Sequence, residues 1–155
     1  MSAVTVWNPI GREGFPFSGT FDGQGYIISN LANSGTGLVG LFGYVSSATI
    51  SNVAVVDSSW YTTTNNVGTI AGTAASSTIQ ICYSESGIAG GSNVGGLVGA
   101  SDTSDISYCY NLSGVAGSVC VGGIVGYNQG TIARVYNVGS VSAIQGNSAG
   151  AIVGY

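Results

Sequence analysis

A six-residue phrase repeats along the chain, and this repetition limits the possible folds more than any other feature of the sequence. It is complete at residues 94–99 (VGGLVG) and 121–126 (VGGIVG), and it returns as AGAIVG at residues 149–154. A weaker copy occupies residues 67–72 and a shortened one residues 40–43. The closing glycines are 29, 27, 27 and 28 residues apart. A fixed period of this length indicates a repeat architecture in which each copy is one structural unit.

The composition narrows the class of protein. The chain has 155 residues, of which 45% are hydrophobic, 27 are glycine and only 5% are charged. Disordered chains are polar and strongly charged, so we expect a folded domain. With a net charge of −4 and only two cations, Arg12 and Arg134, we expect no binding to nucleic acid or to membranes. No run approaches the roughly 18 apolar residues of a membrane-spanning helix, and residues 1–7 show no signal peptide.

Each repeat has the same internal order. The glycine-rich phrase is followed by a polar turn, a strand anchored on isoleucine and a third short stretch. The isoleucine anchors are Ile50, Ile79, Ile106 and Ile132. Apolar residues are spaced by two, and glycine and β-branched residues outnumber helix formers, so helix is disfavoured. These features predict an all-β fold: a parallel β-solenoid of about five coils, with a roughly 27-residue repeat and three short strands per coil.

The repeat does not extend over residues 1–36. This segment contains both prolines and three of the four phenylalanines, and terminal repeats are usually atypical because they cover an open core. We therefore expect residues 1–36 to form an N-terminal cap or first coil, and residues 37–155 to form the solenoid repeats, within a single domain. The phrase at residues 94–99 is predicted to be the inner strand of a coil, with glycines at tight corners and thin walls.

Two stretches resemble a known repeat family. GLVG at residues 96–99, followed by an isoleucine-anchored strand with CYN at residues 109–111, is similar to the GLUG repeat of bacterial surface proteins. The entry at residues 17–25 (FSGTFDGQG) and 28–31 (ISNL) resembles the segment that commonly precedes such repeats. The resemblance implies a β-solenoid used as a stalk, adhesin part or accessory region of large extracellular proteins. It marks an architecture rather than an activity, and it places the chain outside the cell or at the cell surface.

The acidic residues do not form a catalytic pattern. They are Glu13, Asp22, Asp57, Glu85, Asp102 and Asp105. Glycoside hydrolysis needs two facing carboxylates, whereas Asp102 and Asp105 lie in a polar turn and the chain has no histidine or lysine. A polysaccharide-degrading enzyme or a weak calcium site at these two residues is a less favoured alternative, as is ice binding, because no Thr-x-Thr array repeats. We expect no enzyme activity, no metal site and no cofactor.

The three cysteines differ in their setting. Cys82 and Cys109 occupy the same repeat position one coil apart, where valine stands in other coils. Stacked strands place such residues about 4.8 Å apart, within the range of a disulfide, so a disulfide and stacked buried thiols both remain open. Cys120 replaces Asn93 at a corner, where it either links subunits or is a tolerated substitution. Three cysteines without histidine do not indicate a zinc site.

Tyrosines also recur at the repeat period, in two columns. The first column contains Tyr83, Tyr110 and Tyr136, and the second contains Tyr44, Tyr127 and Tyr155. A column of this kind either stiffens a sheet face by stacking or provides a glycan-binding or self-association face, because tyrosine is enriched at interfaces. Both interpretations remain open.

The last repeat leads to a hypothesis about function. It ends just after the first strand of a coil and carries no charged or proline-rich cap. Uncovered strands are templates for pairing, and head-to-tail contacts need not close into rings. The expected interface joins Ala151, Ile152, Val153, Gly154 and Tyr155 to Val4, Val6 and Trp7. We therefore predict a structural, non-enzymatic subunit that self-assembles end to end into an extracellular filament or surface stalk. The alternative is a carbohydrate- or ligand-binding adhesin module that is a fragment of a larger surface protein.

Overall fold

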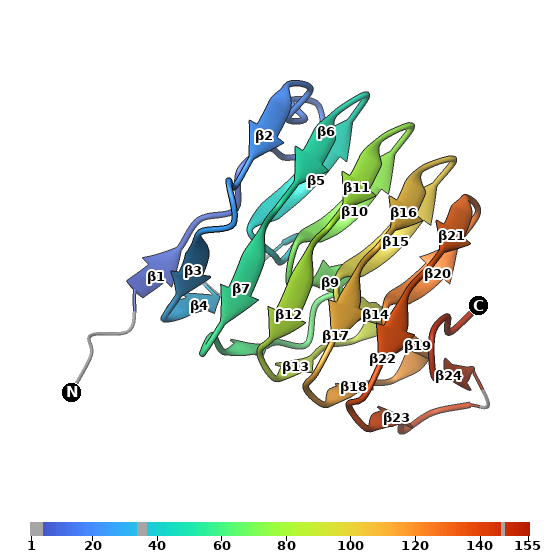
Figure 1. Cartoon of the computed structure of the whole chain (residues 1–155). Helices are drawn as coiled ribbons and strands as arrows, with labels where there is room; N and C mark the ends of the chain where they lie inside the picture. Colours follow the sequence, from blue (N-terminus) through green and yellow to red (C-terminus); the bar gives the residue numbers. More distant parts are fainter. Residues whose placement is uncertain (1–4, 34–36, 147) are drawn as a thin grey trace.

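The computed structural model describes residues 5–33, 37–146 and 148–155, and within these residues it contains strands and no helix (Figure 1). The strands wind into stacked coils from the blue N-terminal end to the red C-terminal end of the molecule. Paired positions of successive coils, such as Ile79 and Ile106, are 27 residues apart. The predicted all-β parallel solenoid of about five coils is therefore confirmed. In the part of the chain that the structure describes, no helix is available to cross a membrane.

A full coil contains five strands, not the three predicted. One coil runs through β10 (Ala71–Ala75), β11 (Thr78–Gln80), β12 (Tyr83–Glu85), β13 (Ile88–Ala89) and β14 (Ser92–Gly95). The sequence conceals the additional strands because several corners are turned by one non-glycine residue with positive φ. Ser76 and Ile81, with φ of 46° and 54°, turn two corners of this coil. Neither is glycine or proline, the residues that usually mark a break between strands.

Strands at the same position in successive coils pair in parallel and form five sheets along the solenoid. Two sheets have five strands. The first contains β2 (Thr20–Asp22), β6 (Thr49–Ser51), β11, β16 (Asp105–Ser107) and β21 (Thr131–Ala133). The second contains β3 (Ile27–Ser29), β7 (Ala54–Val56), β12, β17 (Tyr110–Asn111) and β22 (Tyr136–Asn137). Three sheets have four strands. One contains β5 (Phe42–Ser46), β10, β15 (Val98–Asp102) and β20 (Val125–Asn128). Another contains β8 (Trp60–Tyr61), β13, β18 (Val115–Gly117) and β23 (Val141–Ala143), and the last contains β9 (Val67–Gly68), β14, β19 (Val119–Gly122) and β24 (Ala149–Gly150). Equivalent residues therefore stack in columns.

Columns of apolar side chains fill the interior. The predicted isoleucine column is confirmed, because Ile50, Ile79, Ile106 and Ile132 pair in register on neighbouring strands. The first three are at most 1% exposed, whereas Ile132 in the last coil is only half-buried. Burying one isoleucine side chain stabilises a fold by roughly 1.5–3 kcal/mol. Each added coil therefore gains stability mainly by covering the column of the coil before it.

The repeated phrase at residues 94–99 is a corner, not the inner strand predicted. Its first two residues end β14, its last two begin β15, and Gly96 and Leu97 form the bend between them. Leu97 is fully buried. A Cβ on Gly96 would collide with the backbone oxygen of Gly123 in the next coil and lie 2.7 Å from the Asn111 side chain, so this glycine is required by these two close approaches, rather than by its φ angle.

The described part of residues 1–36 forms an irregular first coil. Strand β1 (Thr5–Trp7) pairs with β4 (Leu31–Asn33), while β2 and β3 extend the two five-stranded sheets. The rings of Phe17 and Phe21 lie against Phe42, with centroids 5.0 and 5.4 Å apart. Aromatic side chains thus close much of this end of the core, as expected for a first coil or cap.

Candidate functional site

The most regular surface feature is a ladder of tyrosine rings on the outer face of β12, β17 and β22. Tyr83, Tyr110 and Tyr136 are paired in register, which confirms the predicted column. Their ring centroids are 4.8 and 4.9 Å apart, and the rings are parallel to within 4°. Because Tyr110 is covered by a neighbour on each face, the ladder is not a flat platform on which a polysaccharide could lie.

The environment of the ladder is apolar and negatively charged. Burial raises the pKa of Tyr110, and the neighbouring Tyr83, Tyr136 and Glu85 raise it further. Glu85 lies on the same strand as Tyr83, two residues further along, and so on the same face of the sheet. A carboxylate beside these rings disfavours anionic ligands and favours cations.

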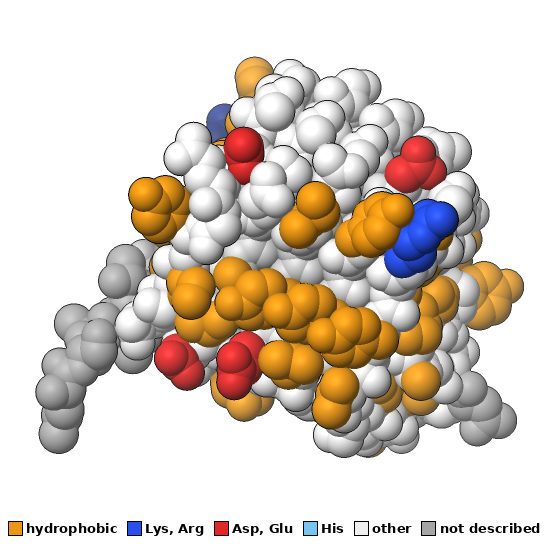
Figure 2. Space-filling model, viewed as in Figure 1, with side chains coloured by type: hydrophobic (Ala, Val, Ile, Leu, Met, Phe, Trp, Pro, Cys, Tyr) orange, Lys and Arg blue, Asp and Glu red, His pale blue; other side chains and the backbone are white. Residues whose placement is uncertain are grey.

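The ladder belongs to a continuous apolar band. Figure 2 shows this band in orange across β7, β12, β17 and β22. Large apolar side chains around the ladder are unusually exposed, and they include Ile27, Ile81, Tyr108, Tyr136 and Val138, each at least 51% exposed. Contiguous exposed apolar surface of this kind commonly marks an interaction site. We take this band as the candidate functional surface.

A narrow groove of about 230 Å³ lies beside the ladder. One wall is formed by the corner residues Ile81 and Tyr108, the other by Tyr83 and Tyr110, and Ala54 contributes to the floor. Ala54 pairs in register with Tyr83 and therefore occupies a ladder position, but it has no ring. The groove is thus deepest where the column of rings stops.

The second predicted tyrosine column is confirmed only in part. Tyr127 and Tyr155 stack with centroids 5.5 Å apart and rings 7° from parallel. Tyr44 lies in the same register, but Thr73 and Ala100 separate it from Tyr127. This column therefore has a stacked pair at the C-terminal end and no continuous ladder.

Cys82 and Cys109 are stacked buried thiols, and both are free. Each Sγ donates to the carbonyl oxygen two residues earlier, at 3.2 Å for Cys82 and 3.1 Å for Cys109. A hydrogen bond with Cys109, together with burial, raises the pKa of the Cys82 thiol. Cys120 is half-buried at a corner with φ of 54°, equivalent to Asn93 with φ of 56°, which confirms the predicted equivalence.

The carboxylates are dispersed over the surface. Asp102 and Asp105 are both exposed, on either side of the corner at Thr103, and their strand partners are alanine and threonine rather than acids. Hydrogen bonds from the Asn52 side chain and the Gln24 backbone lower the pKa of Asp22, so that Asp22 is ionised. Among the described residues, no group of three or more histidine, cysteine, aspartate or glutamate side chains could hold a metal ion.

The residues of the predicted end-to-end interface lie at opposite ends of the solenoid (Figure 1). Val153 bridges to Val125, and the Tyr155 N–H donates to Gly126 O, so residues 151–155 begin a further turn beside β20. At the other end Val6 is 70% exposed. Trp7 is half-buried, with its Nε1 donating to a backbone carbonyl at 3.0 Å. Val4 lies outside the described residues.

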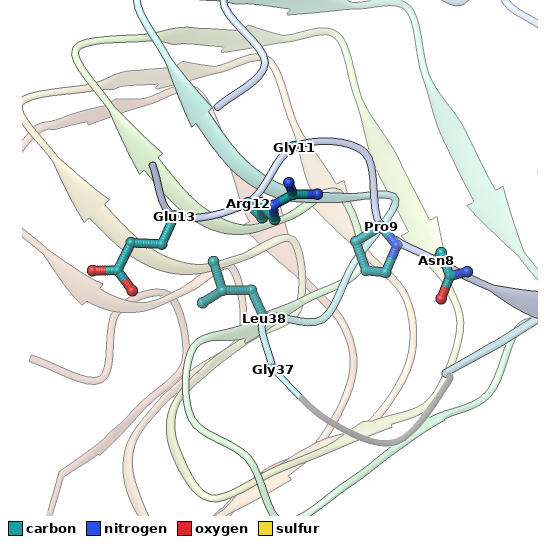
Figure 3. A pocket seen from close by; sticks show the side chains of 7 residues that line it. All are labelled: Asn8, Pro9, Gly11, Arg12, Glu13, Gly37 and Leu38. Carbon is teal, nitrogen blue, oxygen red and sulfur yellow. The ribbon is translucent and has the colours of Figure 1, made fainter. Parts of the chain in front are cut away.

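A wider hollow of about 600 Å³ opens beside the N-terminal segment (Figure 3). It is lined by loop residues that include Asn8, Arg12, Glu13 and Leu38. The Arg12 guanidinium carbon lies 4.9 Å from the ring centroid of Phe15. One acid and one base on an open loop do not form a catalytic or metal-binding arrangement.

Sequence reasoning missed a buried asparagine ladder. Asn111 is fully buried, and its Nδ2 donates to Ser113 O at 2.7 Å and to Asn137 Oδ1 at 2.9 Å. Asn137 repeats the local bond by donating to Gly139 O at 2.8 Å. The signal available was the position of both asparagines directly after a ladder tyrosine.

Comparisons with models of protein families, with curated proteins and with solved structures found no match. The strand pairing defines the chain as a parallel β-solenoid. The resemblance to the GLUG repeat stays a prediction that depends on the residues quoted for it.

Proposed function

We propose that this chain is a structural, non-enzymatic subunit that assembles head to tail into an extracellular filament or surface stalk. The observation that carries the proposal is the match between the two ends of the five-stranded sheets. In the described residues, β2 and β3 pair on one side only, with β6 and β7, and β21 and β22 pair on one side only, with β16 and β17. All these pairs are parallel, so β21 of one copy can pair with β2 of the next, and β22 with β3.

The side chains at the two ends support this arrangement. Ile132 is the last member of the isoleucine column and Phe21 the first, and both are half-buried. Stacking of two copies would cover both and recover the burial that the inner members of the column already have.

The joint uses two of the five sheets. In the first coil β4 bridges through Ala32 to Ser59 beside β8, β1 pairs with β4, and only Val39 among the described residues bridges to β9. At the other end, a hollow of about 330 Å³ opens among Asn137, Val141 and Ala149. The absence of enzymatic activity is proposed because the carboxylates are dispersed, and the extracellular location follows from the GLUG-like resemblance.

A cysteine pair tests the joint directly. Thr20 and Thr131 are exposed members of one register column, so in the assembly their Cα atoms would be about 4.8 Å apart, which a disulfide can span. The variant T20C/T131C, made with C120N to remove the half-exposed thiol, should give covalent oligomers beyond the dimer after mild oxidation. Negative-stain electron microscopy of the wild-type protein should show fibres of uniform width.

The matched control is T20C/S142C with C120N, because Ser142 is exposed on β23, outside the proposed joint. It should give no oligomers beyond the dimer. A wild-type protein that sediments as a monomer at high concentration, or a T20C/T131C variant that stops at the dimer, would overturn the proposal.

A further inference from the structure

We propose that the groove beside Ala54 binds the guanidinium group of an arginine side chain presented by a partner protein. The inference goes beyond self-assembly, since the groove lies on the flank of the solenoid and not at the joint. It follows from three features of the described residues: the end of the tyrosine ladder at Tyr83, the acidic groups near the groove, and the stacking of both arginines of this chain on aromatic rings.

The tyrosine ladder ends at Tyr83. Along this row the register is Ile27, Ala54, Tyr83, Tyr110 and Tyr136, so rings occupy the last three steps only. The face of Tyr83 that points along the row toward Ala54 therefore has no tyrosine against it, unlike both faces of Tyr110. A flat group inserted there would continue the stack.

The dimensions of the groove favour a thin, planar group. Its volume is about 230 Å³, and Ala54 in its lining is only 3% exposed, so the neighbouring side chains leave little room beside this residue. A guanidinium is planar and stacks on aromatic faces. A sugar ring is a puckered chair and is best accommodated on an open aromatic platform, which the stacked rings do not offer.

The charge of the region selects a cation. The chain has six acidic and two basic residues. At one rim of the groove, the Asn52 Nδ2 donates to Asp22 Oδ1 at 2.9 Å, which places an ionised carboxylate and an amide beside each other. Glu85 lies along the strand from Tyr83. Carboxylate and amide oxygens accept hydrogen bonds from the guanidinium N–H groups while its plane covers the ring.

The molecule already uses this contact twice. The Arg134 guanidinium carbon lies 5.2 Å from the ring centroid of Tyr108, whose side chain forms one wall of the groove. Arg12 lies 4.9 Å from the Phe15 ring centroid. Both arginines of the chain thus cover aromatic rings, and a partner's arginine over Tyr83 would repeat the arrangement at the Ala54 step, next to the end of the ladder.

Isothermal titration calorimetry with two peptides tests the proposal. One peptide alternates glycine with arginine, and its control alternates glycine with lysine at the same length and charge. The arginine peptide should bind several-fold more tightly at physiological salt. A54Y completes the ladder and should abolish this preference, while Y83L removes the ring and should weaken binding about two- to fivefold, as expected for one exposed cation–π contact. Tyr136 also has one face without a ring, but it does not line the groove, so Y136L should bind as the wild type does.

The binding results distinguish an arginine site from attraction by net charge and from a glycan site. Equal binding of both peptides would show attraction by net charge alone and would overturn the proposal, as would no binding at all. Binding of a neutral cello-oligosaccharide that A54Y abolishes, without binding of the arginine peptide, would replace it with a glycan site. Circular dichroism verifies that A54Y is folded. If A54Y does not fold, the comparison of Y83L with Y136L decides, and equal weakening by both would overturn the proposal.

Discussion

Exchanging one pair of interior side chains for the pair found in the neighbouring coil should lower the free energy of unfolding by less than the sum of the two single changes. Gly96 faces Asn111 across the interior. In the preceding coil, Thr69 takes the position of Gly96 and Ser84 that of Asn111, and both are fully buried. A larger side chain on one wall thus accompanies a smaller one on the other.

The magnitudes follow from the contacts. In G96T alone the new Cβ would collide with the backbone oxygen of Gly123 and approach Asn111 Cγ to 2.7 Å, and such overpacking costs about 1–3 kcal/mol. N111S alone removes the hydrogen bonds from Asn111 Nδ2 to Ser113 O and Asn137 Oδ1, which costs about 2–3 kcal/mol. In the double variant the threonine fills the space vacated by Asn111, and once the backbone moves away from Gly123 O the hydroxyl can donate to that oxygen, as Thr69 donates to Gly96 O at 2.6 Å.

We therefore expect G96T/N111S to be more stable than the sum of the single changes by about 2 kcal/mol. It should remain about 1–3 kcal/mol less stable than the wild type, because Ser84 Oγ, its counterpart, has no hydrogen-bond partner among the described residues. Urea unfolding followed by circular dichroism measures all four proteins. The matched control is N128S, which removes the same kind of hydrogen bond, from the Asn128 side chain to the backbone oxygen two residues later, at 2.9 Å. Additive effects in G96T/N111S, within about 0.5 kcal/mol, would refute the reasoning.

Three further expectations concern the surface and the thiols. I81N should raise the free energy of unfolding by about 1 kcal/mol, because Ile81 holds φ of 54°, which β-branched residues tolerate poorly; an unchanged urea midpoint would contradict this. The pKa of Tyr110 is raised above 10.0 in the folded protein. The stability that this shift provides is complete below about pH 10 and is lost as the pH rises through the pKa of Tyr110 in the folded protein. Y110F should flatten this alkaline loss in thermal unfolding. An alkylating reagent should modify Cys120 in the folded protein and reach Cys82 and Cys109 only in denaturant, as mass spectrometry would show; equal labelling of all three before unfolding would argue against buried thiols.

The period of the sequence was sufficient to predict the columns. Once the closing glycines are aligned, the isoleucine column through Ile79 and the ring column through Tyr110 follow from counting residues. Both are confirmed because the strands of successive coils pair in register, although the step from one isoleucine to the next is 29, 27 and 26 residues. The irregular first coil could also be predicted, since residues 1–36 carry most of the phenylalanine and lack the phrase.

The number of strands and the groove could not be predicted. A corner formed by Ser76 or Ile81 leaves no mark in the sequence, because its left-handed conformation is imposed by the stacked coils on either side rather than by the residue itself. The groove depends on the absence of a ring at Ala54, and a small residue in a column carries no signal until the neighbouring walls are known. The asparagine ladder could not be predicted for the same reason, since burial of Asn111 depends on Gly96 at a distant corner of the coil.

The corners formed by residues with positive φ affect how the surface of the solenoid can change during evolution. Four successive coils place Asn52, Ile81, Tyr108 and Arg134 at the same corner, with φ between 53° and 55°. An amide, an aliphatic chain, a phenol and a cation thus occupy equivalent places on one unchanging frame. A substitution at this corner alters what the flank presents without moving a strand, so the chemistry of each coil can diversify independently of its neighbours. The equivalent corner residues of successive coils form a row with a spacing of about 4.8 Å, in which a linear epitope could be engineered with one residue in each coil.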